Sequence, residues 1–124
     1  MEICNLEIAK KLKEKGFNEP CYKYYQKGVL DSDDCWNRYN KGTADRCSAP
    51  TISQVLKWLR EEKKYHIEFV GNACGYLFII SDIPSEGGTD RYCSDYSGPN
   101  DGGTWDKYED CAIASIEYVL DNLI

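Results

Sequence analysis

The chain has 124 residues, of which 42% are apolar and 29% charged, and its formal net charge is −6, a composition typical of one globular domain in water. No run of about 18 apolar residues is present, which argues against a membrane-spanning helix. The N-terminus also lacks the basic segment and apolar core of a signal peptide, so we expect a cytoplasmic protein with no membrane association.

The charges are distributed unevenly along the chain. Residues 1–70 contain 13 Lys and Arg against 11 Asp and Glu, a balance of +2, whereas residues 71–124 contain 2 against 10, a balance of −8. An acidic surface repels the phosphate backbone of nucleic acids and attracts basic proteins. The C-terminal half therefore predicts a basic protein partner rather than nucleic acid. The alternative is a solvated acidic face that only aids solubility.

A short helix is predicted between residues 6 and 15. Asn5 is typical of an N-cap. Gly16 followed by Phe17 is typical of a helix end at which glycine adopts the left-handed conformation and the next apolar residue packs back on the helix. The helix is short and rich in lysine, so we expect it to depend on packing against the rest of the chain.

Residues 20–40 are rich in aromatic side chains and predict a β-hairpin whose turn lies between residues 27 and 34. Residues 41–49 are expected to connect this hairpin to the next helix. Aromatic rings interleaved with Lys and Arg can stack nucleic-acid bases, so binding of single-stranded nucleic acid is one alternative function. Packing of the rings against the helix is the other explanation. The residues of this alternative site are Tyr22, Tyr24, Trp36 and Arg38.

The middle of the chain has the clearest pattern. Thr51 and Gln54 form a capping box at the start of a helix that continues to residue 64. Apolar and mixed residues then alternate over 65–70, as in a half-buried strand. Residues 76–80 are apolar on both faces, which is typical of a central strand that is covered on both sides or lies under a helix, and we expect this strand over 76–83. The five residues between the two strands predict a turn.

Residues 84–106 form a long loop rich in glycine and aspartate, with an edge strand predicted at 90–95. A final helix is predicted over 107–123, with Asp106 and Glu109 as its capping box. The loop and this helix are the predicted protein-binding surface. Its candidate residues are Asp90, Asp95, Asp101, Trp105 and Asp106.

Seven cysteines lie 12 to 27 residues apart, without the closely spaced pairs of a structural zinc site, and their odd number without a signal peptide indicates reduced thiols. A small Cys/His hydrolase is a third alternative, in which His66 would activate a thiol and Glu68 would orient His66. No fingerprint of a kinase, a phosphate-binding loop or a dinucleotide site is present. We therefore predict no catalytic residues, no metal site and no cofactor.

Several segments of the chain together resemble known small proteins. They are Leu6, Leu12-Lys13, Gly16-Phe17, Glu19-Pro20-Cys21, Ala49-Pro50-Thr51, Gln54-Val55, Trp58-Leu59-Arg60-Glu61, Tyr108-Glu109 and Ala112. This combination, which covers most of the chain, is similar to small uncharacterised proteins of gut Bacteroides genomes and their phages. The resemblance implies a phage or mobile-element origin and no particular chemistry.

A second resemblance covers residues 76–120. An apolar strand ending in Asp82-Ile83-Pro84, a glycine-bearing loop, and Gly103-Thr104 leading into Tyr108-Glu109 and Ala112 resemble the HicB-type antitoxin module. That family combines a helix-flanked three-stranded sheet with inhibition of a small ribonuclease, so the resemblance implies an acidic module that binds a basic toxin. The loop is longer here than in the family, and no appended DNA-binding domain is evident.

These patterns predict a single α+β domain. Residues 1–48 would form the N-terminal helix and aromatic hairpin, and residues 49–124 the helix–strand–strand–loop–helix core. We expect a largely antiparallel sheet of three or more strands, with the helices at 51–64 and 107–123 packed on one face. The leading hypothesis is a non-enzymatic intracellular protein-interaction module. Binding of single-stranded nucleic acid and Cys/His hydrolysis are the alternatives.

Overall fold

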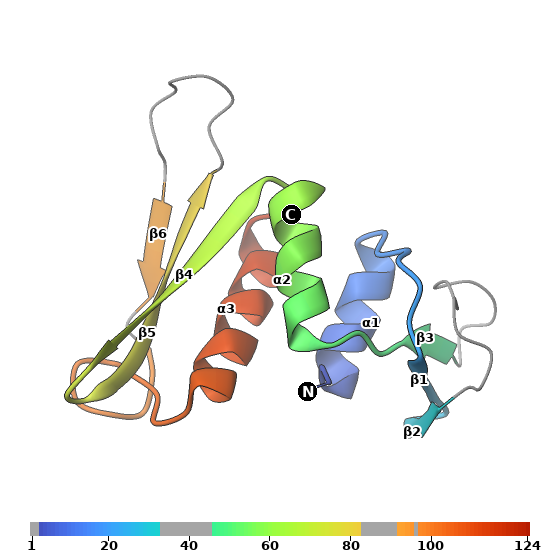
Figure 1. The fold of residues 1–124 in the computed structure, drawn as a ribbon, viewed down its shortest axis with the longest axis horizontal. Helices are drawn as coiled ribbons and strands as arrows, with labels where there is room; N and C mark the ends of the chain where they lie inside the picture. Colours follow the sequence, from blue (N-terminus) through green and yellow to red (C-terminus); the bar gives the residue numbers. More distant parts are fainter. Residues whose placement is uncertain (1–2, 33–45, 83–91, 96) are drawn as a thin grey trace.

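The computed structural model describes residues 3–32, 46–82, 92–95 and 97–124 and confirms the α+β fold (Figure 1). Its helices are α1 (Leu6–Glu14), α2 (Ile52–Glu61) and α3 (Tyr108–Asn122), and its strands are β1 (Lys23–Gln26), β2 (Val29–Ser32), β3 (Arg46–Ser48), β4 (Tyr65–Asn72), β5 (Gly75–Asp82) and β6 (Tyr92–Asp95). The predictions for Trp36, Arg38, Asp90 and the rest of the loop residues 84–91 lie outside the described residues. None of the helices in the described ranges is long and apolar enough to cross a membrane.

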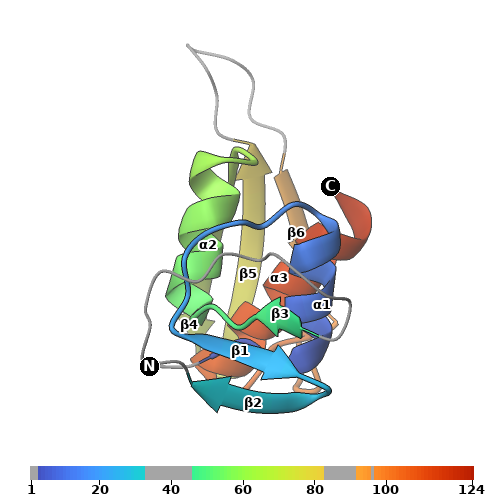
Figure 2. The same ribbon diagram turned by 90° about the vertical axis from the view of Figure 1, so that its right-hand side faces the viewer.

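The described strands form two antiparallel sheets with the helices between them. The large sheet has the strand order β4-β5-β6 and the small sheet β2-β1-β3. Two perpendicular views show α2 and α3 on one face of the large sheet and α1 between α3 and the small sheet (Figures 1 and 2). This confirms the predicted three-stranded sheet with two helices on one face and an additional N-terminal helix.

The ends of α1 follow the sequence prediction closely. The Asn5 Oδ1 atom accepts a hydrogen bond from the Ile8 backbone N–H at 2.9 Å, which satisfies one of the free donors at the helix start. Gly16 has φ of +90°, and the Phe17 N–H donates to the Leu12 carbonyl at 2.9 Å. This is the predicted glycine-terminated helix end, and Phe17 is buried beneath it.

At the start of α2, one of the two hydrogen bonds of the predicted capping box is present. The Thr51 hydroxyl accepts from the Gln54 backbone N–H at 3.1 Å, but the Gln54 side chain donates to the Pro20 carbonyl at 3.0 Å instead of reaching back. The helix ends at Glu61, so the predicted end at Lys64 is wrong by three residues. Lys64 has a positive φ of 64°, and this left-handed residue turns the chain directly into β4.

The β4–β5 hairpin is longer than predicted. The two strands pair in unbroken register from Tyr65 opposite Asp82 to Asn72 opposite Gly75, which leaves only Ala73 and Cys74 as the turn. The predicted five-residue turn is therefore wrong, because its outer residues join the strands. β5 is the central strand and one of its faces lies under the helices, which agrees with the second of the two predicted arrangements (Figure 1).

The small sheet corrects two expectations about the N-terminal part. The hairpin turn is Lys27-Gly28, with φ of 52° and 80° as in a tight two-residue turn, so Asp31 belongs to β2 instead of the turn. Part of the expected connector, Arg46–Ser48, is a third strand that pairs with β1. Three residues are too few to show an alternating pattern, so only the long-range pairing reveals this strand.

The start of α3 also differs from the prediction. Lys107 is the N-cap residue and makes no side-chain capping bond. Asp106, predicted as the cap, accepts a hydrogen bond from the Asn100 side chain at 2.6 Å. The capping box with Glu109 is therefore wrong, because Asp106 is engaged by the loop that precedes the helix.

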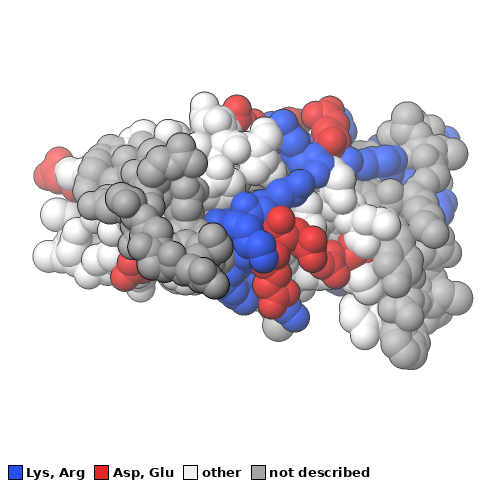
Figure 3. All heavy atoms as spheres, turned by 90° about the horizontal axis from the view of Figure 1, so that it is seen from above, with Lys and Arg blue, Asp and Glu red and all other residues white. Residues whose placement is uncertain are grey.

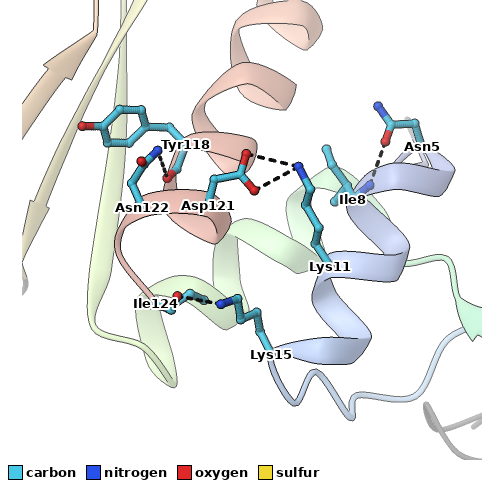
Figure 4. Close-up of polar contacts among 8 residues, drawn as sticks. All are labelled: Asn5, Ile8, Lys11, Lys15, Tyr118, Asp121, Asn122 and Ile124. Atoms are coloured by element: carbon cyan, nitrogen blue, oxygen red, sulfur yellow. Dashed lines mark hydrogen bonds and ion pairs between the residues drawn. The ribbon is translucent and has the colours of Figure 1, made fainter.

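Polar contacts attach α1 to the C-terminal end of α3 (Figure 4). Lys11 Nζ lies 3.0 Å from Asp121 Oδ1, and Lys15 Nζ donates to the Ile124 carbonyl at 2.8 Å. The Lys11 and Asp121 side chains are 32% and 48% exposed, so water screens the pair and its contribution to stability is small, about 0–1 kcal/mol. The apolar core between the helices accounts for most of the attachment.

Candidate functional site

The loop at 97–106 is fixed to the tip of the β4–β5 hairpin. The Thr104 hydroxyl and the Asn100 amide both donate to the Cys74 carbonyl at 2.8 Å. Tyr76 and Trp105 exchange two backbone hydrogen bonds, of 2.7 and 2.9 Å, so this end of the loop continues the large sheet beyond β6. The loop is therefore a rigid part of the fold in these residues.

Two glycines allow the backbones to approach this closely. A Cβ atom on Gly75 would lie 2.3 Å from the Trp105 carbonyl oxygen, and Gly75 has φ of +136°. A Cβ atom on Gly98 would lie 2.4 Å from the Thr104 carbonyl oxygen. No other residue type fits at either position without displacement of the backbone, so these glycines set the shape of the loop.

The predicted partner-binding residues differ in their exposure to solvent. Asp101 and Asp106 are exposed, and Asp95 is the last residue of β6, opposite Phe78. Trp105 is half-buried, with its ring centroid 5.7 Å from that of Phe78, so its ring supports the loop from the helix side of the sheet. Asp90 lies outside the described residues.

Residues 97–106, which we call the acidic loop, are followed by exposed side chains at the start of α3 that extend its surface. Tyr108 is 43% exposed, and its ring centroid lies 4.8 Å from that of Phe69 and 5.9 Å from that of Tyr76. Glu109 and Asp110 follow it in the first turn and are exposed. We name this surface the acidic end and define it by Asp101, Asp106, Tyr108, Glu109 and Asp110.

The face of the molecule that is seen from above has a different charge pattern. Seen from above, the Lys and Arg side chains are mixed with Asp and Glu over the middle of the molecule (Figure 3). The fields of neighbouring opposite charges offset one another in part, and salt at physiological ionic strength screens what is left beyond about 10 Å. The acidic end lies beside the tip of the β4–β5 hairpin, at the lower end of the large sheet in Figure 1.

The face of the large sheet that points away from the helices carries an apolar strip. Val70 of β4 pairs with Leu77 of β5, and Ile79 lies two residues further along β5 on the same face. Val70 is 37% exposed, and Leu77 and Ile79 are half-buried without joining the main core. No described element covers this face, and the strip begins beside the hairpin tip (Figure 1).

The alternative nucleic-acid surface is only partly described. Tyr22 is 66% exposed, and the Arg46 guanidinium lies 5.0 Å from the centre of the Tyr24 ring. Arg46 therefore supplies a cation beside these rings on the small sheet. Trp36 and Arg38 lie outside the described residues.

His66 does not meet a thiol in the described part of the chain. Its side chain is exposed on the outer face of β4, where Ser81 is its partner on β5. The cysteine side chains that the structure describes are all free thiols, and none bonds to His66. Within the described residues, no three His, Cys, Asp or Glu side chains form a group that could hold a metal ion.

Most of the described thiols are held in an unreactive state. Burial raises the pKa of Cys4 to about 12, with the nearby thiols of Cys21 and Cys47 adding to the increase. Burial also raises the pKa of Cys21 and of Cys111, each to about 11. Cys74, by contrast, is exposed at the hairpin tip. Since the thiolate is the reactive form, the buried cysteines act as apolar side chains.

We therefore expect alkylating reagents to separate Cys74 from Cys4 in the folded protein. At about pH 8 the pKa of Cys4 lies about four units higher, so roughly one Cys4 thiol in ten thousand is ionised, and none of its surface is exposed. Mass spectrometry after brief treatment with iodoacetamide should find Cys74 modified and Cys4 intact. Equal modification of both without denaturant would contradict this assignment.

The acidic end, with the apolar strip beside it, is therefore the candidate functional site of the described surface. Comparison of the sequence with family models and with curated proteins, and of the structure with solved structures, finds no match.

Proposed function

We propose that the protein is a non-catalytic interaction module whose acidic end binds a basic protein partner. The observation that carries this proposal is the exposed Tyr108 ring, which packs on the β4–β5 hairpin and is followed in the first turn of α3 by the exposed carboxylates of Glu109 and Asp110. An aromatic side chain with a polar rim is the usual composition of a protein-binding hot spot. The apolar strip around Val70, on the other side of the hairpin tip, would widen the contact.

The charge of this part of the chain favours a basic partner. Residues 71–124 carry a balance of −8, and four carboxylates belong to the acidic end itself. Complementary charge accelerates association and disfavours acidic competitors such as nucleic acids. In keeping with the resemblance to antitoxin modules, a small basic ribonuclease of a phage or mobile element is the partner class that we propose, acting in the cytoplasm.

The rigidity of the acidic loop supports the same function. The bonds of Asn100 and Thr104 to the Cys74 carbonyl hold the loop in one conformation before any partner arrives. Binding then requires little additional ordering of the backbone, and ordering is a major cost of association. A loop that only solubilised the protein would gain nothing from this fixation.

The proposal is tested by neutralising the acidic end and by a matched control. The test variant is Asp101→Asn/Glu109→Gln/Asp110→Asn. The control is Glu7→Gln/Glu61→Gln/Glu62→Gln, which removes the same charge from exposed positions elsewhere and also changes the first turn of a helix. Each tagged protein captures partners from a lysate of the source organism, once without and once with nuclease treatment, and quantitative mass spectrometry compares the captured proteins.

We expect one or more basic proteins to be retained by the wild type and the control and reduced about tenfold or more with the test variant, since several charge-assisted contacts are lost. Affinity of the purified partner should fall with increasing salt in the same order. Equal capture by all three proteins, or capture that disappears with nuclease, would refute the proposal.

A second candidate function is binding of single-stranded nucleic acid. The exposed Tyr22 and the Arg46–Tyr24 pair favour it, because stacked rings beside a guanidinium are suited to bases and phosphates. If nuclease abolishes capture, Tyr22→Ala/Arg46→Gln should weaken binding to a fluorescent oligonucleotide. Unchanged affinity in that variant would exclude this surface.

A further inference from the structure

A groove separates α1 from the small sheet at the opposite end of the molecule from the acidic end. Its volume is about 640 Å³, within the range of small-molecule sites. Leu6 of α1, the Tyr25 ring of β1 and the Cys47 side chain of β3 line its apolar part. Figure 2 shows this side of the molecule, with the small sheet in front of α1.

Three ammonium groups and one carboxylate surround the apolar part of the groove. Lys10, Lys13 and Glu14 come from α1, and Lys27 comes from the hairpin turn. The local balance of +2 stands out in a protein whose net charge is −6. Burial raises the pKa of the Cys47 thiol, and the positive charges of Lys13 and Lys10 offset part of this increase. Both lysines therefore lie close enough to Cys47 to influence its charge.

The walls of the groove are fixed by independent contacts. Lys13 Nζ donates to the Arg46 carbonyl at 2.6 Å, which holds α1 against β3. The Tyr25 hydroxyl donates to the Cys4 carbonyl at 2.8 Å, so its ring keeps one orientation. A Cβ atom on Gly28 would lie only 3.8 Å from Leu6 Cδ2, so the hairpin turn closes one end of the groove against α1.

We propose that this groove binds a small amphipathic anion, with an apolar body of one or two rings and a single carboxylate, sulfonate or phosphate group. The body would lie on Leu6 and Tyr25, and the anionic group would meet the ammonium groups of Lys10 and Lys27. This site is separate from the acidic end and does not depend on the function proposed for it.

The simpler explanation is a solvated lysine face on a short helix. That explanation accounts for Lys10 on α1 but not for Lys27, which comes from another element and lies beside an apolar floor that water solvates poorly. Glu14 supplies one carboxylate against the three lysines that line the groove, so the lining keeps an excess of positive charge that attracts an anion. In a ligand of the proposed class, the anionic group would neutralise the lysines and the rings would cover the apolar surface of the groove.

Anilinonaphthalene sulfonate is a suitable probe, because it has two rings and one anionic group, and N-phenylnaphthylamine is its uncharged counterpart. The test variant is Lys10→Gln/Lys27→Gln. The control is Lys57→Gln/Arg60→Gln, which removes two positive charges from exposed positions on α2. A second variant, Leu6→Glu, places a carboxylate in the groove at the start of α1, where a helix tolerates an acidic residue. Circular dichroism confirms that each variant is folded.

We expect the sulfonate dye to bind the wild type and the control with one site, and to bind both test variants about tenfold or more weakly, because charge-assisted contacts are lost. The neutral dye should bind weakly, and equally to the wild type, the control and Lys10→Gln/Lys27→Gln, because these three proteins keep the apolar part of the groove. Sulfonate binding that is absent, or unchanged in Lys10→Gln/Lys27→Gln, would overturn the proposal. Binding of a partner protein at the acidic end should be the same in this variant as in the wild type, so the two proposals fail independently.

Discussion

Replacement of Gly75 by alanine is expected to destabilise the protein by about 3 kcal/mol. The new Cβ atom would lie 2.3 Å from the Trp105 carbonyl oxygen, and alanine would have to adopt the φ of +136° that glycine has there. Either β5 or the loop must move, and the two backbone hydrogen bonds between Tyr76 and Trp105 are lost with that movement. Urea unfolding followed by tryptophan fluorescence measures the loss.

A second glycine in the same loop provides the control. Gly102 has a positive φ of 79°, but a Cβ atom added there meets nothing within 4 Å. Gly102→Ala should therefore cost only the backbone strain, about 1 kcal/mol. Similar losses for the two variants would show that close contact with Trp105 does not determine the conformation of the loop. Hydrogen exchange at the Tyr76 amide should accelerate only in Gly75→Ala.

The sequence was most informative where a structure depends on near neighbours in the chain. The Asn5 cap and the glycine-terminated end of α1 were predicted, since each involves residues at most five apart. The strand β3 was missed because its identity depends on pairing with β1, about twenty residues earlier. The cap of α3 was wrong for a different reason, since Asn100, six residues earlier in the same loop, binds the Asp106 carboxylate.

The candidate sites were less predictable than the fold. The Tyr108 ring, in the first turn of α3, packs on Phe69 and Tyr76 of the β4–β5 hairpin, a contact between separate elements that no local sequence pattern indicates. The basic groove gave no sequence signal, because Lys10 and Lys27 are far apart in a segment whose total charge is close to neutral. Surfaces assembled from several elements require the tertiary structure.

Replacement of Phe17 by alanine is expected to destabilise the whole protein by about 4 kcal/mol. Phe17 is 1% exposed and lies edge-on to Trp58 of α2, with ring centroids 5.2 Å apart. Its side chain belongs to one continuous core that also contains residues of α3 and the large sheet. Removal of the ring leaves a cavity between the N-terminal part (residues 1–48) and residues 49–124, so both parts of the chain lose apolar contacts.

The same variant tests whether residues 1–48 and 49–124 fold as one domain. The Gln54 side chain bonds to Pro20, and Lys11 pairs with Asp121, so polar contacts also cross this boundary. We therefore expect one transition, at lower urea, when circular dichroism and tryptophan fluorescence are compared. The control Tyr22→Ala, at a position 66% exposed, should shift the transition by no more than about 0.5 kcal/mol. Two separate transitions in Phe17→Ala would instead mean that the N-terminal part unfolds alone, and the single-domain prediction would be wrong.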